Sequence, residues 1–386
     1  MKKQIYLISV IIIFLSFTLK AQDSIMILKN SLKFQGQLST WAHINDRNSY
    51  PLYIGGRYIP QVNYKIQLSK DKLIDFEASV NLYGDAGIHF FDSAYADGKI
   101  SPYRLWGRYS TEQLEIRIGM QKINFGSATM LRALRWFDKI DPRDPLQLTD
   151  GVRAVLARYY FLNNANIWLW SLYGNKNPKG FEFVKTNFTH PEFGGRFQYP
   201  IPCGEAAISF NHRIADSRDI NNDIPAFKEI PENKIGIDVK MDMTVGVWFE
   251  GVWVNKTKNI GEFTNQEVMT VGTDYTFALG KGLNIVIEHM LIAYNEKAFQ
   301  FSDTRNFSGV SLSYPIGIFD KLNSIIYYDW TTNSVYNFVN WYRQFNRTTF
   351  YVMGYWNPED NKMPIMGAAK NLYGGKGVQI MFVFNH

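Results

Sequence analysis

Apolar and polar residues alternate one by one along most of this chain, and this alternation restricts the fold more than any other feature. In residues 73–83 (LIDFEASVNLY) every even-numbered residue is apolar, while positions 75, 77, 79 and 81 are Asp, Glu, Ser and Asn. A period of two places the two sets on opposite faces of a β-strand. The same pattern recurs in residues 32–42, 61–68, 114–121, 235–242, 269–277, 310–314 and 378–384.

The polar faces of these strands distinguish a transmembrane barrel from a soluble β-sandwich, which also has alternating strands. They carry formal charges in strand after strand, and a sandwich core would not accommodate so many. Aromatic residues make up 16% of the chain, and many lie near predicted strand ends, as do Tyr159, Tyr275 and Trp330. Such positions are typical of the aromatic girdles of transmembrane barrels. The chain also closes with an amphipathic, aromatic-rich strand, KGVQIMFVFNH.

The N-terminal residues 1–21 read as a cleaved signal peptide. Two lysines precede a short, mostly apolar run from Ile5 to Leu19, and Ala21 is a suitable residue for cleavage. The alternative is an uncleaved anchor helix, although the run is short for a membrane span. We therefore predict an exported chain that resides in the outer membrane of a Gram-negative bacterium. Residues 22–386 show no internal repeat or linker and are predicted to form a single barrel domain.

The predicted fold class is all-β: a closed antiparallel transmembrane barrel of about 18 strands, within a range of roughly 16 to 18. A barrel of this size encloses an aqueous lumen and leaves no strand edge unpaired in lipid. Long polar stretches alternate with tight connections, which predicts long loops at one end and short turns at the other. The long stretches are residues 46–56, 84–98, 175–193, 215–232, 295–305 and 357–375.

Residues 122–150 form a connection that is too long for a hairpin between the strands predicted on either side. Ser127 can cap a short helix over Ala128–Phe137, and Pro142 and Pro145 then favour an extended path. We predict that this segment folds into the lumen as a constriction loop that carries a short helix.

Charged residues concentrate in this loop and on the strands beside it. A row of guanidinium groups on a wall of low dielectric constant would attract anions and carboxylates. The alternative is that the arginines pair with Glu115, Asp138, Asp141, Asp144 and Asp150 and pin the loop, and both interpretations can hold together. The candidate residues for the pore constriction and for solute contact are Arg104, Arg108, Arg117, Arg132, Arg135, Asp138, Asp141, Arg143, Asp144 and Arg153.

Other functional classes find little support in the sequence. The six histidines are scattered singly without metal-ligand spacing, and no phosphate-binding or nucleophile motif is present, so we predict no enzyme, no metal and no cofactor. His212 points away from Ser209 and Asn211 because they alternate on one strand. Loss of the three lysines in residues 1–21 lowers the net charge from +6 to +3, and the remaining charges alternate in sign, so nucleic acid is not a predicted partner.

One segment resembles a known family. RIGMQKINFG, followed by LRALRWFDKIDPRDPLQLTDGVRA, is similar to a segment of large outer-membrane porins of the alginate-export and substrate-specific type from Bacteroidetes-like bacteria. The matching residues are Arg117, Gly119, Gln121, Gly126, Asp141, Pro142, Asp144 and Pro145. The resemblance implies a channel of 16 to 18 strands, either monomeric or homotrimeric, for passive diffusion of small polar solutes.

The predicted function is thus a water-filled porin for small polar or anionic solutes, in contact with outer-membrane lipid. The alternative is a plugged barrel that acts as an accessory subunit of an export or surface-polymer assembly system. A lumen filled by apolar loop contacts would favour the accessory role. A continuous wet path would favour the channel.

Overall fold

The computed structural model describes residues 30–46, 50–89, 92–220, 224–358 and 373–386. The predicted signal peptide, residues 1–21, lies outside these ranges. Within the described ranges the regular structure is β-strand throughout. The strands are β1 (Ser31–Asn45), β2 (Leu52–Ser69), β3 (Lys72–Ile88), β4 (Ala94–Ser110), β5 (Leu114–Gln121), β6 (Val152–Tyr160), β7 (Asn166–Leu172), β8 (Lys185–Thr186), β9 (Glu192–Ile201), β10 (Gly204–Asp216), β11 (Ile230–Asp242), β12 (Gly246–Lys256), β13 (Asn265–Phe277), β14 (Leu283–Asn295), β15 (Thr304–Pro315), β16 (Asp320–Asp329), β17 (Ser334–Gln344), β18 (Thr348–Trp356) and β19 (Lys376–Asn385).

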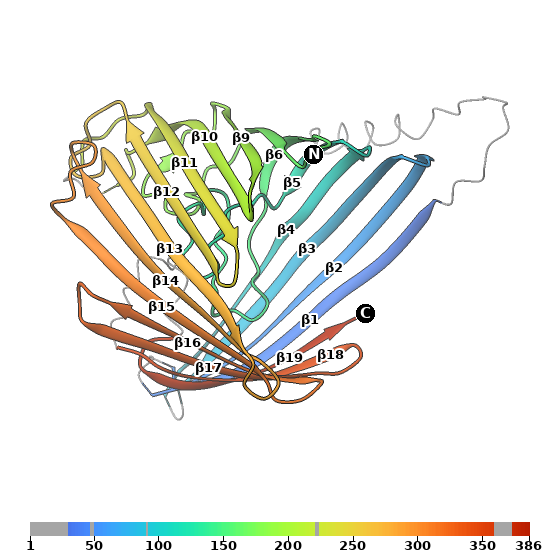
Figure 1. Ribbon diagram of the computed structural model, residues 1–386. Coiled ribbons are helices and arrows are strands. Elements are labelled where there is room, and N and C mark those ends of the chain that lie inside the picture. Colours follow the sequence, from blue (N-terminus) through green and yellow to red (C-terminus); the bar gives the residue numbers. More distant parts are fainter. Residues whose placement is uncertain (1–29, 47–49, 90–91, 221–223, 359–372) are drawn as a thin grey trace, which may run out of the picture.

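The strands close into an antiparallel barrel (Figure 1). Each strand pairs with its neighbour along the chain, and β1 pairs with both β2 and β19, so the sheet has no free edge. The two-residue β8 pairs with β10 beside this ring, while β7 pairs directly with β9. Without β8 the described barrel has 18 strands, which confirms the predicted fold class.

On β3 the alternation of the sequence appears as a polar inward face and an apolar outward face. On β3 the side chains of Phe76 and Val80 are 45% and 38% exposed, whereas Asp75 and Ser79 are each 5% exposed. A soluble sandwich would bury the apolar face instead. This inverted pattern is that of a barrel whose outer surface lies in lipid. No helix in the described part of the chain is long and apolar enough to cross a membrane.

The connections differ between the two ends of the barrel. At the end where β1 begins and β19 ends, which we call the terminal end, strands are joined by short turns such as residues 70–71, 202–203 and 345–347. At the opposite, far end the connections include residues 122–151, 173–191, 217–229 and 357–375. The longest connections of the described strands thus lie at one end, as predicted. The long loop predicted at residues 84–98 is wrong, because residues 84–88 and 94–98 pair with each other as the ends of β3 and β4.

Candidate functional site: the barrel lumen and its inward loop

The connection between β5 and β6, residues 122–151, runs through the barrel interior, and we call it the lumen loop (Figure 1). Its first half is apolar and buried: Leu131, Leu134 and Trp136 are each less than 5% exposed. These side chains belong to one hydrophobic cluster with inward-facing residues of the wall. The wall members on β12–β18 are Val252, Val254, Val268, Met290, Ile292, Phe307, Tyr327, Tyr336, Phe338, Met353 and Tyr355.

Two wall carboxylates hold the tip of the lumen loop. Glu288 on β14 accepts hydrogen bonds from the backbone N–H groups of Thr129 (2.6 Å), Met130 (2.9 Å) and Leu131 (2.5 Å). Glu250 on β12 accepts hydrogen bonds from the N–H groups of Ala128 (2.8 Å) and Leu134 (3.1 Å). Both carboxylates are fully buried, so these charge-assisted hydrogen bonds replace the hydrogen bonds to water that the carboxylates lose on burial.

Neither Glu250 nor Glu288 was among the site residues predicted from the sequence. A signal was present at Glu288, which is the one charge among Val286, Met290 and Ile292 on the inward face of β14. A lone charge on an otherwise apolar inward face indicates a buried partner. Which segment would supply that partner could not be read from the strand itself.

The short helix predicted over Ala128–Phe137 is absent, and this part of the prediction is wrong. In a helix the N–H of Leu134 would donate to the carbonyl of Met130, but it donates to the wall carboxylate Glu250. The N–H of Trp136 donates to the carbonyl of Leu134 at 2.9 Å, which is also not a helical pairing. The stripe of apolar residues that indicated a helix is explained by burial against the barrel wall.

Two ion pairs form between charged residues of the lumen loop. Arg132 donates to Asp138 at 2.7 and 3.2 Å, and Arg143 donates to Asp141 at 2.8 Å. Arg135 lies 4.9 Å from the centre of the Phe181 ring and is 4% exposed, and this burial lowers the pKa of its guanidinium. The pairing that sequence analysis left open is thus present within the loop.

The wall arginines are also paired. Arg108 on β4 donates to Asp75 at 2.8 and 2.9 Å and to Glu115 at 3.1 Å, and Arg117 on β5 donates to Glu115 at 3.1 Å. Arg104 donates to the carbonyl of Thr149 at 2.8 Å and so ties the end of the lumen loop to β4.

Arg153 is the exception among the predicted residues. On β6 the inward positions are those of Ala154, Leu156 and Arg158, whereas Arg153 shares the parity of Val155, which is 43% exposed. Arg153 therefore has outward parity on β6, because the inward parity starts one residue earlier, at Val152. At the far end its side chain nevertheless lines a cavity of about 350 Å³ together with Lys139 and Asp150 of the lumen loop.

The second half of the lumen loop leaves open space beside the wall. A cavity of about 450 Å³ lies between loop residues Pro142 to Gln147 and inward-facing residues of β15–β18. Asp144 lines it and accepts hydrogen bonds from the N–H groups of Leu146 and Leu148, at 2.9 and 3.4 Å. Burial raises the pKa of the Asp144 carboxyl above its ordinary value.

Arg57 on β2 is a further residue of the lumen that was not predicted from the sequence. It lies over the ring of Tyr83, 5.2 Å from its centre, and its charge acts on Asp144 of the lumen loop. Within the described residues it forms no ion pair. Its position in the sequence could have indicated a lumen residue, because Arg57 shares the inward parity of Gly55 and Ile59 on β2.

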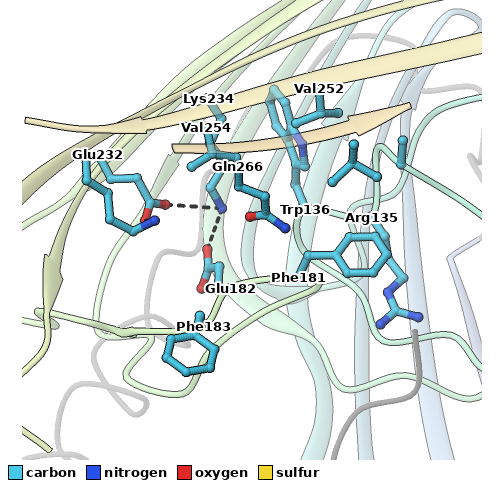
Figure 2. A pocket seen from close by; sticks show the side chains of 13 residues that line it. Arg135, Trp136, Phe181, Glu182, Phe183, Glu232, Lys234, Val252, Val254 and Gln266 are labelled. Carbon is cyan, nitrogen blue, oxygen red and sulfur yellow. Dashed lines mark hydrogen bonds and ion pairs between the residues drawn. The ribbon is translucent and has the colours of Figure 1, made fainter. Parts of the chain in front are cut away.

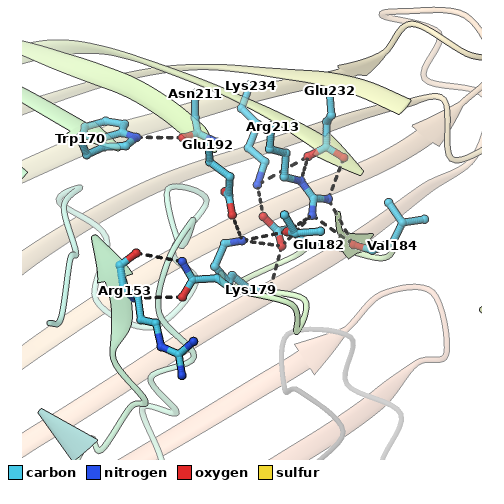
Figure 3. A network of polar contacts seen from close by, with 12 residues as sticks. Arg153, Trp170, Lys179, Glu182, Val184, Glu192, Asn211, Arg213, Glu232 and Lys234 are labelled. Carbon is cyan, nitrogen blue, oxygen red and sulfur yellow. Dashed lines mark hydrogen bonds and ion pairs between the residues drawn. The ribbon is translucent and has the colours of Figure 1, made fainter. Parts of the chain in front are cut away.

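A buried ionic cluster ties the connection between β7 and β9, residues 173–191, to the wall (Figure 3). We call this connection the second loop. Its Glu182 pairs with Arg213 at 3.0 Å and with Lys234 at 2.6 Å, and its Lys179 pairs with Glu192 at 2.8 Å. Burial acts to raise the pKa of Glu182, but the surrounding cations outweigh burial and lower it to about 2.

The second loop also packs on the lumen loop. Figure 2 shows Phe181 between Arg135 on one side and the Glu182–Lys234 contact on the other. The space left between the two loops and β12 is a cavity of only about 20 Å³. That is room for about one water molecule, so the two loops close this side of the lumen together.

Comparison with known proteins adds evidence on the fold. No protein-family model matches the chain, and no curated protein matches its sequence at a significant level. Among solved structures, Pseudomonas aeruginosa OccK5 (OpdH) is similar with a TM-score of 0.55 at 7% identity, over 92% of this chain and 97% of that chain. Acinetobacter baumannii OccAB1 is similar with a TM-score of 0.53 at 7% identity, over 92% and 96%.

The chain has the fold of outer-membrane porins. At 7% identity these likenesses bear on the fold alone.

Proposed function

We propose that the protein is a channel in the bacterial outer membrane through which small polar solutes diffuse passively. The observation that carries this proposal is the polar cavity of about 450 Å³ on the side of the lumen that the apolar half of the lumen loop leaves unfilled. The cavity lies inside a closed barrel whose outer surface faces lipid, so polar solutes in it are separated from the membrane.

Within this proposal the constriction consists of the loop residues Arg143, Asp144 and Gln147 and the wall residue Arg57. Arg143 and Asp144 were among the predicted residues, and Asp144 lies where the charge of Arg57 acts on it. The roles of Arg104, Arg108, Arg117, Arg132, Arg135, Asp138 and Asp141 are then to hold the loop and the wall in shape. Anions would be favoured by Arg57, whose charge is not paired within the described residues.

The test is single-channel conductance of refolded protein in planar bilayers, with the reversal potential measured in a salt gradient. We expect discrete current steps in the wild type. Arg57→Gln should shift the reversal potential toward cation preference, because a positive charge leaves the constriction. Arg343→Gln is the matched control, since Arg343 on β17 has the outward parity of Val335 and a side chain that is 48% exposed, and it should leave the reversal potential unchanged. Equal shifts in both variants would contradict the assignment of Arg57.

A second candidate function is favoured by a different observation. The apolar half of the lumen loop packs into one cluster with the wall, which was the feature expected of a plugged barrel acting as an accessory subunit of an export or surface-polymer assembly system. In that case the wild type would be silent in bilayers. Current would appear only after deletion of residues 127–148.

We also propose a closer relationship to one type of porin. Membership of the alginate-export and substrate-specific type of Bacteroidetes-like bacteria rests on the segment from Arg117 to Pro145. We infer that no reaction is catalysed. The hydroxyl of Ser209 accepts a hydrogen bond from Arg196 at 3.1 Å, while His212 is hydrogen-bonded to Asn233 at 2.8 Å on the other face of β10.

The proposed partners are outer-membrane lipid and small solutes. The barrel is either a monomer or a homotrimer, and chemical crosslinking distinguishes the two.

A further inference from the structure

The cavity beneath the lumen loop is lined mainly by neutral hydrogen-bonding side chains. It is bounded by the loop residues from Pro142 to Gln147 and by one side of the wall, β15–β18. Its volume of about 450 Å³ falls within the range of small-molecule sites, about 300–1,000 Å³. The neutral polar groups among its lining residues are Gln147, Ser311, Asn323, Asn340, Gln344 and Thr349.

Several of these groups have no partner among the described residues. The side-chain amides of Asn323 and Gln344 form no hydrogen bond there, and Oδ1 of Asn340 is buried without a donor. A buried amide oxygen left without a donor is unfavourable by about 1–3 kcal/mol, so Oδ1 of Asn340 binds water or a solute, while the more exposed amides of Asn323 and Gln344 are open to the same wet cavity. Amides offer both donors and acceptors, which suits hydroxyl groups.

The two formal charges at the cavity are largely engaged by their neighbours. Arg143 is held by Asp141 through Nε and Nη2, at 3.0 and 2.8 Å, while its Nη1 is buried without a hydrogen-bond partner among the described residues. Asp144 accepts two N–H groups of its own turn. A cationic solute would compete with these contacts of Asp144, whereas the one open donor of Arg143 can be taken by the hydroxyl oxygen of a neutral solute.

Two aromatic rings complete the lining. Tyr342 on β17 and Tyr351 on β18 are direct partners in register, with ring centroids 5.6 Å apart and planes inclined by 41°. Both are half-buried and line the cavity. Aromatic faces with hydroxyls at the edge suit a ligand with one apolar C–H face and a polar rim.

We propose that this cavity is a binding subsite for a neutral polyhydroxylated solute, a carbohydrate of one or two rings. The solute would stack on Tyr342 and Tyr351 and exchange hydrogen bonds with Asn323, Asn340 and Gln344. The inference rests on the proposed channel function and names its solute class. A purely apolar ligand would leave the amides unpaired, and a simple anion would leave the aromatic faces unused.

The test measures binding apart from transport. Isothermal titration calorimetry is carried out on the full-length barrel in an amine-oxide detergent, which has no sugar headgroup, with sucrose, sodium galacturonate and a polyethylene glycol of the size of sucrose. We expect binding of sucrose and none of the glycol. Tyr351→Leu and Asn340→Leu should each weaken sucrose binding about tenfold or abolish it.

The matched control is Tyr275→Leu, because Tyr275 is an exposed tyrosine on β13 outside the cavity. It should leave sucrose binding unchanged, and heat-modifiable migration on gels checks that every variant is folded. Absence of sucrose binding to the wild type, or binding of galacturonate in preference to sucrose, would overturn the proposal. So would equal effects of Tyr351→Leu and Tyr275→Leu.

Conductance separates this inference from the proposed function. Sucrose that binds and also interrupts the ionic current of the wild type supports both. Sucrose binding by a barrel that carries no current would support the subsite and contradict the open channel. Current that neither sucrose nor the glycol interrupts, with no calorimetric signal, would support the channel and overturn the subsite.

Discussion

Single residues on the wall decide where the lumen loop lies. The carboxylates of Glu250 and Glu288 take up backbone N–H groups at the loop tip that would otherwise face the apolar wall unpaired. Gly236 on β11 leaves room for loop side chains: a Cβ atom there would lie 2.5 Å from Leu134 and 2.9 Å from Trp136. The two glutamates supply hydrogen-bond acceptors, and the glycine leaves space for the loop side chains.

The role of Glu288 predicts that Glu288→Gln loosens the lumen loop. The amide cannot accept N–H donors on both of its polar atoms, so donors at the loop tip become unpaired, and the stability of the folded barrel should fall by about 3 kcal/mol. Urea unfolding followed by tryptophan fluorescence measures the loss, and bilayer conductance should rise. Glu112→Gln, in an exposed turn, is the control and should change neither quantity.

The space above Gly236 predicts that Gly236→Ala destabilises the packing of Leu134 and Trp136. An added methyl group in a closed contact costs about 1–3 kcal/mol. The matched control is Gly354→Ala, because no atom lies within 4 Å of a Cβ at that position. Midpoints of thermal unfolding should fall for Gly236→Ala alone. Similar midpoints for the two variants would show that the loop does not pack on Gly236 in solution.

At the scale of elements, two connections from the far end fill the lumen in different ways. The lumen loop relies on apolar contacts and on wall carboxylates, whereas the second loop relies on the ionic cluster of Lys179, Glu182 and Arg213. Buried ion pairs are strongly destabilising to break, because a single charge is then left buried. The second loop should therefore respond to pH.

The pKa of Glu182 gives the direction of that response. Because the folded pKa is lowered from 4.5 to about 2, the stabilisation by this carboxylate is complete above pH 4.5 and is lost as the pH falls toward 2. Hydrogen exchange of residues 179–186, corrected for the intrinsic pH dependence, should accelerate within this window. Glu182→Gln should exchange faster at neutral pH and change less below pH 4.5.

A control for this response is Asp219→Asn, which removes a solvent-exposed ion pair with Lys185 in the same region. Surface pairs contribute little, so this variant should follow the wild type. If Asp219→Asn and Glu182→Gln behaved alike, the buried cluster would not be what holds the second loop.

The whole molecule is a barrel with distinct ends, and this predicts its orientation. Barrels of the outer membrane have short turns on the periplasmic side and longer loops outside. Cys203, an exposed cysteine in the turn between β9 and β10, lies at the terminal end and should face the periplasm. A membrane-impermeant maleimide should label it only after the outer membrane is made permeable.

The complementary variant carries Cys203→Ser together with Asn333→Cys, which moves the single cysteine to the connection between β16 and β17 at the far end. It should be labelled in intact cells. Labelling of Cys203 in intact cells would reverse the orientation and place the lumen loop entry on the periplasmic side.

The barrel could be predicted from the sequence, because a period of two is a local property that each strand carries independently. The alternation in residues 73–83 predicted the exposed Phe76 and the buried Asp75 of β3, and the spacing of polar stretches predicted loops at one end. The inward course of residues 122–151 followed from its length and charge. The local pattern of Met130, Ala133, Leu134 and Phe137 was misread as a helical stripe.

Which groups meet inside the lumen depends on contacts between residues far apart in the chain. Glu288 holds Leu131 from 157 positions away in the chain, and the charge of Arg57 acts on Asp144 across the interior. Such contacts depend on how the strands close and on which segments then share the lumen, and no local periodicity carries that information. Burial by the wall also places Arg132 on Asp138 and Arg135 beside the Phe181 ring. Closure of the barrel also left the polar cavity beside Asn340 and Tyr351 open.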